Sequence, residues 1–390
     1  MEFAFFGASA LAGALFISPI IIYSEKGKKM KKIISLMLFM VLVFSTLSLV
    51  SCSISDAIDL ISTHNGIVYR KLDSGEYAVH KVNLNQSSGG ITVYDGEGNI
   101  KERYYRIKGG GNVVIPTTFR NKPVTRIDNY AFQNCLLYSI VIPDSVTYIG
   151  KGAFKGCKYL KNVVIGDGVR IINSSTFQDC KTLSNVSLGK SISTIGENSF
   201  KNCIALYNLE LPNSVTQIDA NAFNGCTSLE NLDLGKSVKT IGNSAFSGCE
   251  ALKIVVIPNS TKEIGASAFK GCTSLKGVLI GASVTTISDS TFENCTLLEE
   301  VVLGPSVTRI NKYAFKGCTA ICEIDIPSSI LSLDSYAFSG CTSITDVYFE
   351  NTTGWIVNSK NIPSTTLEDS EIAAKFFVET IGIYSWTRNK

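Results

Sequence analysis

Histidine is nearly absent from this sequence. The 390 residues contain only His64 and His80, and both precede residue 112. The long region that follows therefore lacks the side chain that most often binds metal or activates a nucleophile. The sequence also lacks a Gly-rich phosphate loop, an H-E-x-x-H motif and a G-x-S-x-G motif. We predict no catalytic residue, no cofactor and no metal site, and we rank an enzyme as the most remote function.

An excess of positive charge is also missing from most of the chain. The formal net charge is +3, and residues 1–51 alone hold five lysines and two glutamates, which gives 5 − 2 = +3. Residues 52–390 are therefore formally neutral. A protein that binds nucleic acid through its phosphates needs a basic surface, so we predict no nucleic-acid partner.

The segment from Met30 to Cys52 has the layout of an export signal. Two lysines follow Met30, a long apolar run comes next, and Leu49-Val50-Ser51 precedes Cys52. This ending resembles the bacterial lipobox. The resemblance implies that residues 30–51 are a lipoprotein signal peptide and that Cys52 is lipidated, with an envelope protein held by lipid on the outer surface. The alternative is a transmembrane anchor with an incidental cysteine.

Residues 1–29 form an uncertain apolar extension. They contain an apolar run long enough to span a bilayer, which could pair with residues 33–51 as a helical hairpin. The other interpretation, which we favour, is that translation starts at Met30 and that residues 1–29 are a start-site artefact.

A single phrase recurs ten times within residues 112–350. Its phenylalanines are 22 residues apart once and 23 apart thereafter, and a cysteine follows three residues after each one. The phenylalanines are Phe132, Phe154, Phe177, Phe200, Phe223, Phe246, Phe269, Phe292, Phe315 and Phe338. A fixed period of this length predicts a solenoid, in which stacked repeats bury one continuous core.

Each repeat contains two short strand signals. An L-x-x-V-x-I phrase alternates apolar and polar residues and ends at Pro or Gly, as at Pro258 and Gly281. A V-T-x-I phrase rich in β-branched residues follows. The residue before each of the ten repeat cysteines is Gly, Asn or Asp. These residues tolerate positive φ, so we predict a left-handed turn there in every repeat.

The pattern S-V-T-x-I-G-x-x-A-F-x-G-C-x-x-L-x-x-V-x-I-P resembles the treponemal-type, BspA-like leucine-rich repeat over residues 112–350. The resemblance implies a right-handed leucine-rich-repeat solenoid of about ten 23-residue coils, exposure at the cell surface, and in some members adhesion to host matrix proteins or to other bacteria. A structural ladder should run through its core. Representative positions are Phe223, Cys226, Phe246, Cys249, Phe269 and Cys272.

The cysteine column is compatible with three arrangements. Free buried cysteine packs as a small apolar residue, a disulfide needs converging Cβ vectors, and a metal site needs clustered ligands. Ladder side chains should point in parallel and the repeats contain no histidine, so we favour free buried thiols. Cys322 comes directly after Ile321 of the strand phrase. Its side chain should therefore point in a different direction from those of the ten repeat cysteines.

Both ends of the solenoid need caps. Residues 52–111 contain strand-like segments around Gly turns and predict a β-rich N-terminal module. Residues 351–390 predict a short helical cap. Thr366 and Asp369 have the spacing of a capping box for a helix over 367–379, with Trp355 and Trp386 packed nearby.

The alternate positions of the strand phrase should face outward across a concave sheet. They form an apolar centre flanked by carboxylates, which can mark an interaction site. The predicted partner-binding residues are Ile254, Val256, Leu279, Val302, Glu300, Glu323, Asp325 and Tyr348. Asn162, Asn185, Asn208 and Asn231 form an outward column, which we expect to be solvated rather than bonded along the column.

The function that fits these features best is a membrane-anchored surface lipoprotein whose solenoid binds protein partners, in the manner of an adhesin. The partners would be host matrix proteins or other surface proteins, and the membrane would be reached through lipid on Cys52. The alternative is a structural lipoprotein of the envelope that faces the periplasm.

Overall fold

The computed structural model describes residues 67–72, 74–82, 91–94, 100–104, 111–381 and 383–389. The chain divides into two units, residues 1–54 and 55–390. Residues 1–29, the predicted signal peptide 30–51 and Cys52 all lie outside the described residues. Within the described part, no helix has both the length and the apolar character needed to cross a bilayer.

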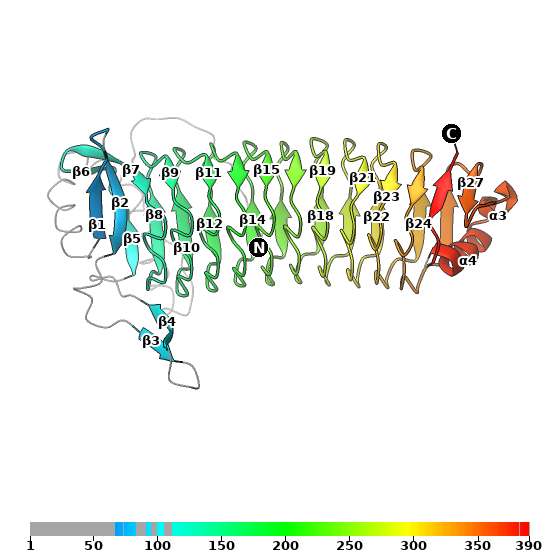
Figure 1. The fold of residues 1–390 in the computed structure, drawn as a ribbon, viewed down its shortest axis with the longest axis horizontal. Coiled ribbons are helices and arrows are strands. Elements are labelled where there is room, and N and C mark those ends of the chain that lie inside the picture. The colour runs from blue at the N-terminus through cyan, green and yellow to red at the C-terminus, as the bar shows by residue number, and fades with distance from the viewer. Residues whose placement is uncertain are drawn as a thin grey trace, which may run out of the picture. The chain divides into compact units, whose positions relative to one another are not determined.

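The repeats form successive coils stacked in one row, and each coil contributes one strand to each of two columns (Figure 1). We call the strands of the L-x-x-V-x-I phrase the A strands. They are β5 (Asn112–Val114), β8 (Ser139–Ile142), β10 (Asn162–Ile165), β12 (Asn185–Ser187), β14 (Asn208–Glu210), β16 (Asn231–Asp233), β18 (Ile254–Val256), β20 (Gly277–Leu279), β22 (Glu300–Val302), β24 (Glu323–Ile326) and β26 (Asp346–Phe349). The expected leucine-rich-repeat solenoid is confirmed.

The V-T-x-I phrases supply the second column, which we call the B strands. They are β7 (Lys122–Ile127), β9 (Tyr148–Ile149), β11 (Ile171–Ile172), β13 (Thr194–Ile195), β15 (Gln217–Ile218), β17 (Thr240–Ile241), β19 (Glu263–Ile264), β21 (Thr286–Ile287), β23 (Arg309–Ile310) and β25 (Ser332–Leu333). Pairing between neighbouring coils is parallel and joins equivalent repeat positions, such as Ile195 with Ile218. The 23-residue period therefore sets the register directly.

Phenylalanine forms the centre of the core. The ten repeat phenylalanines are buried. Each ring stacks on the next, with centroids between 5.0 and 5.6 Å apart and planes inclined by 2° to 19°. Because the rings recur at one position per coil, they form a continuous aromatic column of the kind expected from the spacing.

The turn before each repeat cysteine has the expected left-handed backbone. The backbone φ lies between 56° and 62° at Asn134, Asp179, Asn202 and Asn294. At the other six positions, which are glycines, φ lies between 72° and 78°. A second left-handed column was not expected. It lies two residues before each phenylalanine, where Ser244 has φ 54° and Tyr313 has φ 61°. Serine and tyrosine gave no sign of it, because they seldom adopt positive φ.

The N-terminal end is covered by a hairpin that continues the B column. Strands β1 (Ile67–Lys71) and β2 (Tyr77–Val82) pair antiparallel, and β2 pairs parallel with β7. β6 (Thr118–Phe119) also pairs with β7. Strands β3 (Ile91–Tyr94) and β4 (Ile100–Tyr104) form a separate antiparallel hairpin. The strands predicted before residue 111 are thus present.

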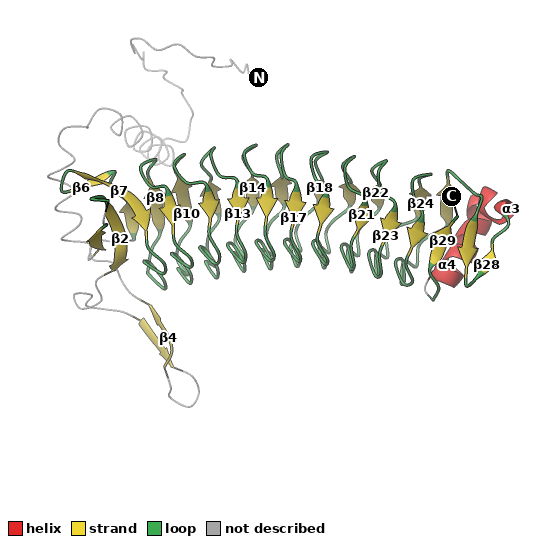
Figure 2. Ribbon diagram, turned by 45° about the horizontal axis from the view of Figure 1, so that its top comes forward, coloured by secondary structure: helices red, strands yellow, loops and turns green. Residues whose placement is uncertain are grey.

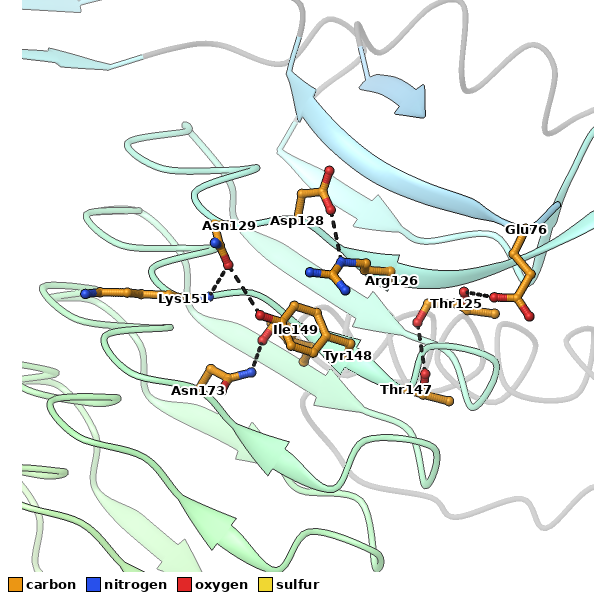
Figure 3. Close-up of polar contacts among 10 residues, drawn as sticks. All are labelled: Glu76, Thr125, Arg126, Asp128, Asn129, Thr147, Tyr148, Ile149, Lys151 and Asn173. Atoms are coloured by element: carbon orange, nitrogen blue, oxygen red, sulfur yellow. Dashed lines mark hydrogen bonds and ion pairs between the residues drawn. The ribbon is translucent and has the colours of Figure 1, made fainter. Parts of the chain in front are cut away.

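Polar side chains tie this hairpin to the first coils (Figure 3). The Thr125 hydroxyl donates to Glu76 Oε2 at 2.7 Å, and the Thr147 hydroxyl donates to the Thr125 carbonyl at 3.3 Å. Arg126 pairs with Asp128 at 3.1 Å and lies 3.9 Å from the centroid of the Tyr148 ring. These contacts join the turn between β1 and β2 to β7, and β7 to the coil that contains β9. β1 is the outermost strand of this sheet.

The C-terminal end is covered by helices and a small antiparallel sheet (Figure 2). The elements are β27 (Trp355–Val357), β28 (Lys360–Asn361), α3 (Ser364–Glu368), α4 (Ser370–Ile381) and β29 (Trp386–Arg388). β29 pairs with β25 of the last coil. The predicted helical cap is therefore present, and Trp355 and Trp386 pack against each other with ring centroids 6.0 Å apart.

The predicted start of the C-terminal helix was wrong. The Thr366–Asp369 spacing indicated a capping box, but Thr366 lies inside α3 and the chain is extended at Asp369, with φ −98° and ψ 120°. The Asp369 carboxylate instead accepts hydrogen bonds from the main-chain N–H groups of Glu371 and Ile372, both at 3.0 Å. Asp369 therefore caps α4, which begins at residue 370.

Candidate protein-binding face

The cysteine column is structural. All ten repeat cysteines are free and buried, as expected. From the second one onward, each thiol also donates a hydrogen bond to the phenylalanine carbonyl of the preceding coil. Examples are Cys226 to Phe200 at 3.2 Å and Cys272 to Phe246 at 3.4 Å. The sequence predicted the burial of these thiols, but the donor role was missed.

Burial makes Cys226 and Cys341 poor nucleophiles. It raises the pKa of Cys226 and of Cys341 to about 12, so the reactive thiolate is scarce at neutral pH. Cys322 differs because it is exposed. Among the described residues, no three His, Cys, Asp or Glu side chains are grouped to hold a metal ion.

The outward positions of the A strands form the surface that we call the A face. The predicted alternation is present. Val255 is buried between exposed Ile254 and Val256, and Val278 is buried between half-buried Gly277 and exposed Leu279. Four aliphatic side chains on β18, β20 and β22 form an apolar strip. Their exposed fractions are 63% for Ile254, 55% for Val256, 45% for Leu279 and 53% for Val302. Aliphatic side chains this exposed on adjacent strands leave a contiguous apolar surface in water.

Gly277 leaves a hollow in the apolar strip. It lies beside Ile254 on one side and Glu300 on the other in the parallel register. A Cβ atom added to Gly277 would meet only Glu300 atoms, the nearest at 3.9 Å. The space above the Gly277 backbone is therefore large enough for a side-chain carbon at an ordinary van der Waals distance. An aliphatic side chain from a partner could fill it.

Carboxylates border the strip along both directions of the solenoid. Glu210 and Asp233 lie on β14 and β16, while Glu300, Glu323 and Asp325 lie on β22 and β24. Asp346 on β26 accepts a hydrogen bond from the Ser370 hydroxyl at 2.6 Å, which links the A face to α4. Tyr348 on the same strand is 47% exposed. All eight predicted partner-binding residues therefore lie on one face.

A groove extends from the strip past the ends of its strands. Its volume is about 760 Å³, and its walls include Val256, Leu279, Asp233, Gly235, Pro258 and Gly281. The Pro and Gly residues end the A strands. They were recognised in the sequence only as strand terminators, because the groove depends on how neighbouring turns stack.

The asparagine column is bonded in pairs, which corrects the expectation of solvated side chains. Asn185 Nδ2 donates to Asn162 Oδ1 at 2.8 Å, and Asn231 Nδ2 donates to Asn208 Oδ1 at 2.6 Å. The A column is interrupted between β12 and β14, where strand pairing stops. The two amide pairs lie on either side of this interruption, so strand pairing determines which amides meet.

Two cations lie at the starts of the strip strands. Lys253 precedes β18 and forms an ion pair with Glu230 at 2.7 Å, and Lys276 precedes β20. The hydrogen bond from Lys253 lowers the pKa of the Glu230 carboxyl. Positive charge is thus placed at the starts of β18 and β20, whereas β22 is preceded by the carboxylate of Glu299.

Comparison with known proteins identifies the repeat. A family model described as BspA type leucine rich repeat region (6 copies) matches residues 125–253 and 239–360. No curated protein matches the chain significantly.

Several solved structures resemble the chain at low identity. A leucine-rich repeat protein from Bacteroides ovatus is 24% identical, with 68% of this chain and 87% of that chain covered and a TM-score of 0.39. The leucine rich repeat protein of T. pallidum is 23% identical over 66% of this chain and 88% of that chain, with a TM-score of 0.37. A leucine rich cell surface protein from Faecalibacterium prausnitzii is 22% identical over 68% and 94%, with a TM-score of 0.32. The family model covers more than half of the 390 residues and falls on the coils described above, and the chain therefore belongs to the BspA-type leucine-rich repeat family.

Proposed function

We propose that this chain is a membrane-anchored lipoprotein of the cell surface whose solenoid binds protein partners through the apolar strip, in the manner of an adhesin. The repeat family points to a protein-binding role in general. The observation that carries the specific proposal is the exposure of Ile254, Val256, Leu279 and Val302 side by side on β18, β20 and β22. The proposed role is non-catalytic.

The energetics of the strip favour association with a protein. Burial of each half-exposed aliphatic side chain would favour binding by about 1 kcal/mol. The carboxylates around the strip give it the polar rim typical of protein interfaces, in which the centre supplies most of the affinity. The A strands from β14 to β26 span six strand intervals, or about 29 Å at the usual strand spacing. This is a length that a standard interface would occupy.

The anchor proposal rests on the sequence around Cys52. Metabolic labelling with an alkyne-tagged fatty acid tests it. If Cys52 carries a lipid, the wild-type chain takes up the alkyne and becomes fluorescent when an azide dye is coupled to it. The Cys52→Ser variant should lose the label. Labelling that persists in this variant would contradict lipidation at Cys52.

Protease treatment of intact cells tests the orientation. Immunoblotting with antibody to residues 112–350 should show loss of the solenoid while a periplasmic control protein survives. Full protection until the membrane is ruptured would remove the adhesin proposal. It would favour the alternative, a structural lipoprotein that faces the periplasm.

A further inference from the structure

The A face carries charge of one sign. Among the outward positions of the described A strands, the charged residues are all carboxylates: Glu210, Asp233, Glu300, Glu323, Asp325 and Asp346. No lysine or arginine occupies such a position. Residues 52–390 are formally neutral, so this arrangement is a local segregation of charge and does not follow from the composition.

The B column provides the contrast. Its exposed positions mix both signs, as with Glu263 on β19 and Arg309 on β23. On the A face, the carboxylates of Glu300, Glu323 and Asp325 form no ion pair with any described residue. Unpaired carboxylates of one sign lower the potential of the whole face and attract a partner of opposite charge.

The order of the charges along the solenoid restricts the shape of that partner. Carboxylates on β14 and β16 come first, the apolar strip on β18 to β22 follows, and carboxylates on β22 to β26 end the series. An extended segment that covers about 29 Å contains about nine residues. Its central residues would lie on the strip and its two ends on the carboxylates.

We propose that the partner presents an extended segment with aliphatic residues at its centre and lysine or arginine at both ends, laid along the solenoid axis across the A face. This inference rests on the proposed function and names the chemistry of its partner. One aliphatic side chain of the segment fills the hollow above Gly277. The cationic ends pair with Asp233 on one side and with Glu323 and Asp325 on the other.

Three synthetic peptides test this inference on the full-length chain. The first is Lys-Lys-Ser-Val-Leu-Val-Ser-Lys-Lys, the second replaces its lysines with glutamates, and the third replaces its aliphatic residues with asparagines. Each carries a fluorescent label, and binding is followed by fluorescence anisotropy at low and high salt. The first peptide should bind at least about tenfold more tightly than either other peptide at low salt, and the advantage over the second should shrink at high salt.

Matched variants assign the charge effect to the A face. Glu323→Gln with Asp325→Asn should weaken binding of the first peptide about fivefold to tenfold at low salt. Glu263→Gln with Asp289→Asn removes the same charge away from the A face and should leave binding unchanged. Gly277→Val fills the hollow without a backbone clash and should weaken binding of the first peptide at both salt concentrations.

The outcomes separate this inference from the proposed function. Val256→Asn with Leu279→Asn removes apolar surface without adding charge. If this variant loses binding but the first two peptides bind equally well, the cationic partner is overturned and the apolar strip remains as a binding surface. If the variant binds all peptides like the wild type, both proposals fail. No binding of the first peptide to the wild type also overturns the inference.

Discussion

The thiol of Cys249 donates a hydrogen bond to the main-chain carbonyl of Phe223, 26 residues earlier and one coil away, at 3.4 Å. The same carbonyl accepts the main-chain N–H of Cys226 at 3.2 Å. The thiol of each coil thus gives a second hydrogen bond to a main-chain carbonyl in the turn of the preceding coil. This relationship favours cysteine over alanine, because the thiol adds a hydrogen-bond donor. The apolar core favours cysteine over serine, because a buried thiol packs as a small apolar group.

Substitution of one ladder cysteine tests this explanation. Cys249→Ala should lower the free energy of unfolding by about 1–2 kcal/mol, because it removes both the thiol donor and the packing of the sulfur. Urea denaturation followed by circular dichroism measures the change. The exposed Cys322→Ala change should cost less than about 0.5 kcal/mol. Equal losses in the two variants would contradict a special role for the column.

Thiol reactivity provides a second test. At mildly alkaline pH, a cysteine-specific reagent should modify the peptide that contains exposed Cys322 and leave the peptides that contain Cys226 and Cys341 unmodified. The pKa of these two buried thiols is raised to about 12 by desolvation, and the reagent cannot reach them. Mass spectrometry of the digested protein measures each site. All sites should react in denaturant, and fast labelling of Cys226 in the native protein would argue against the buried column.

The phenylalanine column should dominate stability. Phe246 is fully buried and stacks on Phe223 at 5.1 Å and on Phe269 at 5.3 Å. Phe246→Ala should therefore lower the free energy of unfolding by about 3–5 kcal/mol. Leu297, which is 46% exposed, provides the control, and Leu297→Ala should cost less than about 1 kcal/mol. A small effect at Phe246 would mean that the coils do not depend on the aromatic column.

Glu293 should make stability depend on pH. Partial burial alone would raise the pKa of its carboxyl, but Lys270 at 2.8 Å, a hydrogen bond from Ser290, and Lys316 at 3.3 Å outweigh this effect and hold the pKa below the ordinary value of 4.5. A lowered pKa in the folded state stabilises the fold above pH 4.5, and the stabilisation is lost as the pH falls through the folded-state value.

Glu293→Gln should therefore lower the free energy of unfolding by about 1 kcal/mol at neutral pH. The gap between wild type and variant should close in acid, below the ordinary pKa of the carboxyl. Denaturation midpoints measured across this range decide the question. A gap that stays constant with pH would show that the ion pairs contribute nothing.

The solenoid could be predicted from the sequence because all of its repeated features follow the same period as the phenylalanines. The spacing of Phe223, Phe246 and Phe269 predicted the core, and the residues before the cysteines predicted the left-handed turns. The alternation in the strand phrase also predicted that Val256 and Leu279 are exposed. Each of these features depends on position within one coil, which a single copy of the phrase already specifies.

Features that depend on contacts between coils could not be read in the same way. The thiol bond from Cys249 and the pairing of Asn162 with Asn185 require the offset between neighbouring coils. The groove beside Pro258 requires the stacking of successive turns. The start of α4 at residue 370 was missed because Asp369 can serve either as the N-cap that precedes a helix or as the fourth residue of a capping box. Only the extended backbone at Asp369 decides between the two.

The most direct test of the central claim is the affinity of strip variants for a protein partner. Full-length chain is passed over immobilised extracellular matrix proteins in a surface plasmon resonance experiment, and the tightest binder is retained. Val256→Lys with Leu279→Lys should weaken that binding at least about tenfold, because two charges would have to be desolvated at the centre of the interface. The matched control, Asn185→Lys with Ser187→Lys on β12, should bind like the wild type. Unchanged affinity in the correctly folded strip variant would contradict the assignment of this face as the binding surface.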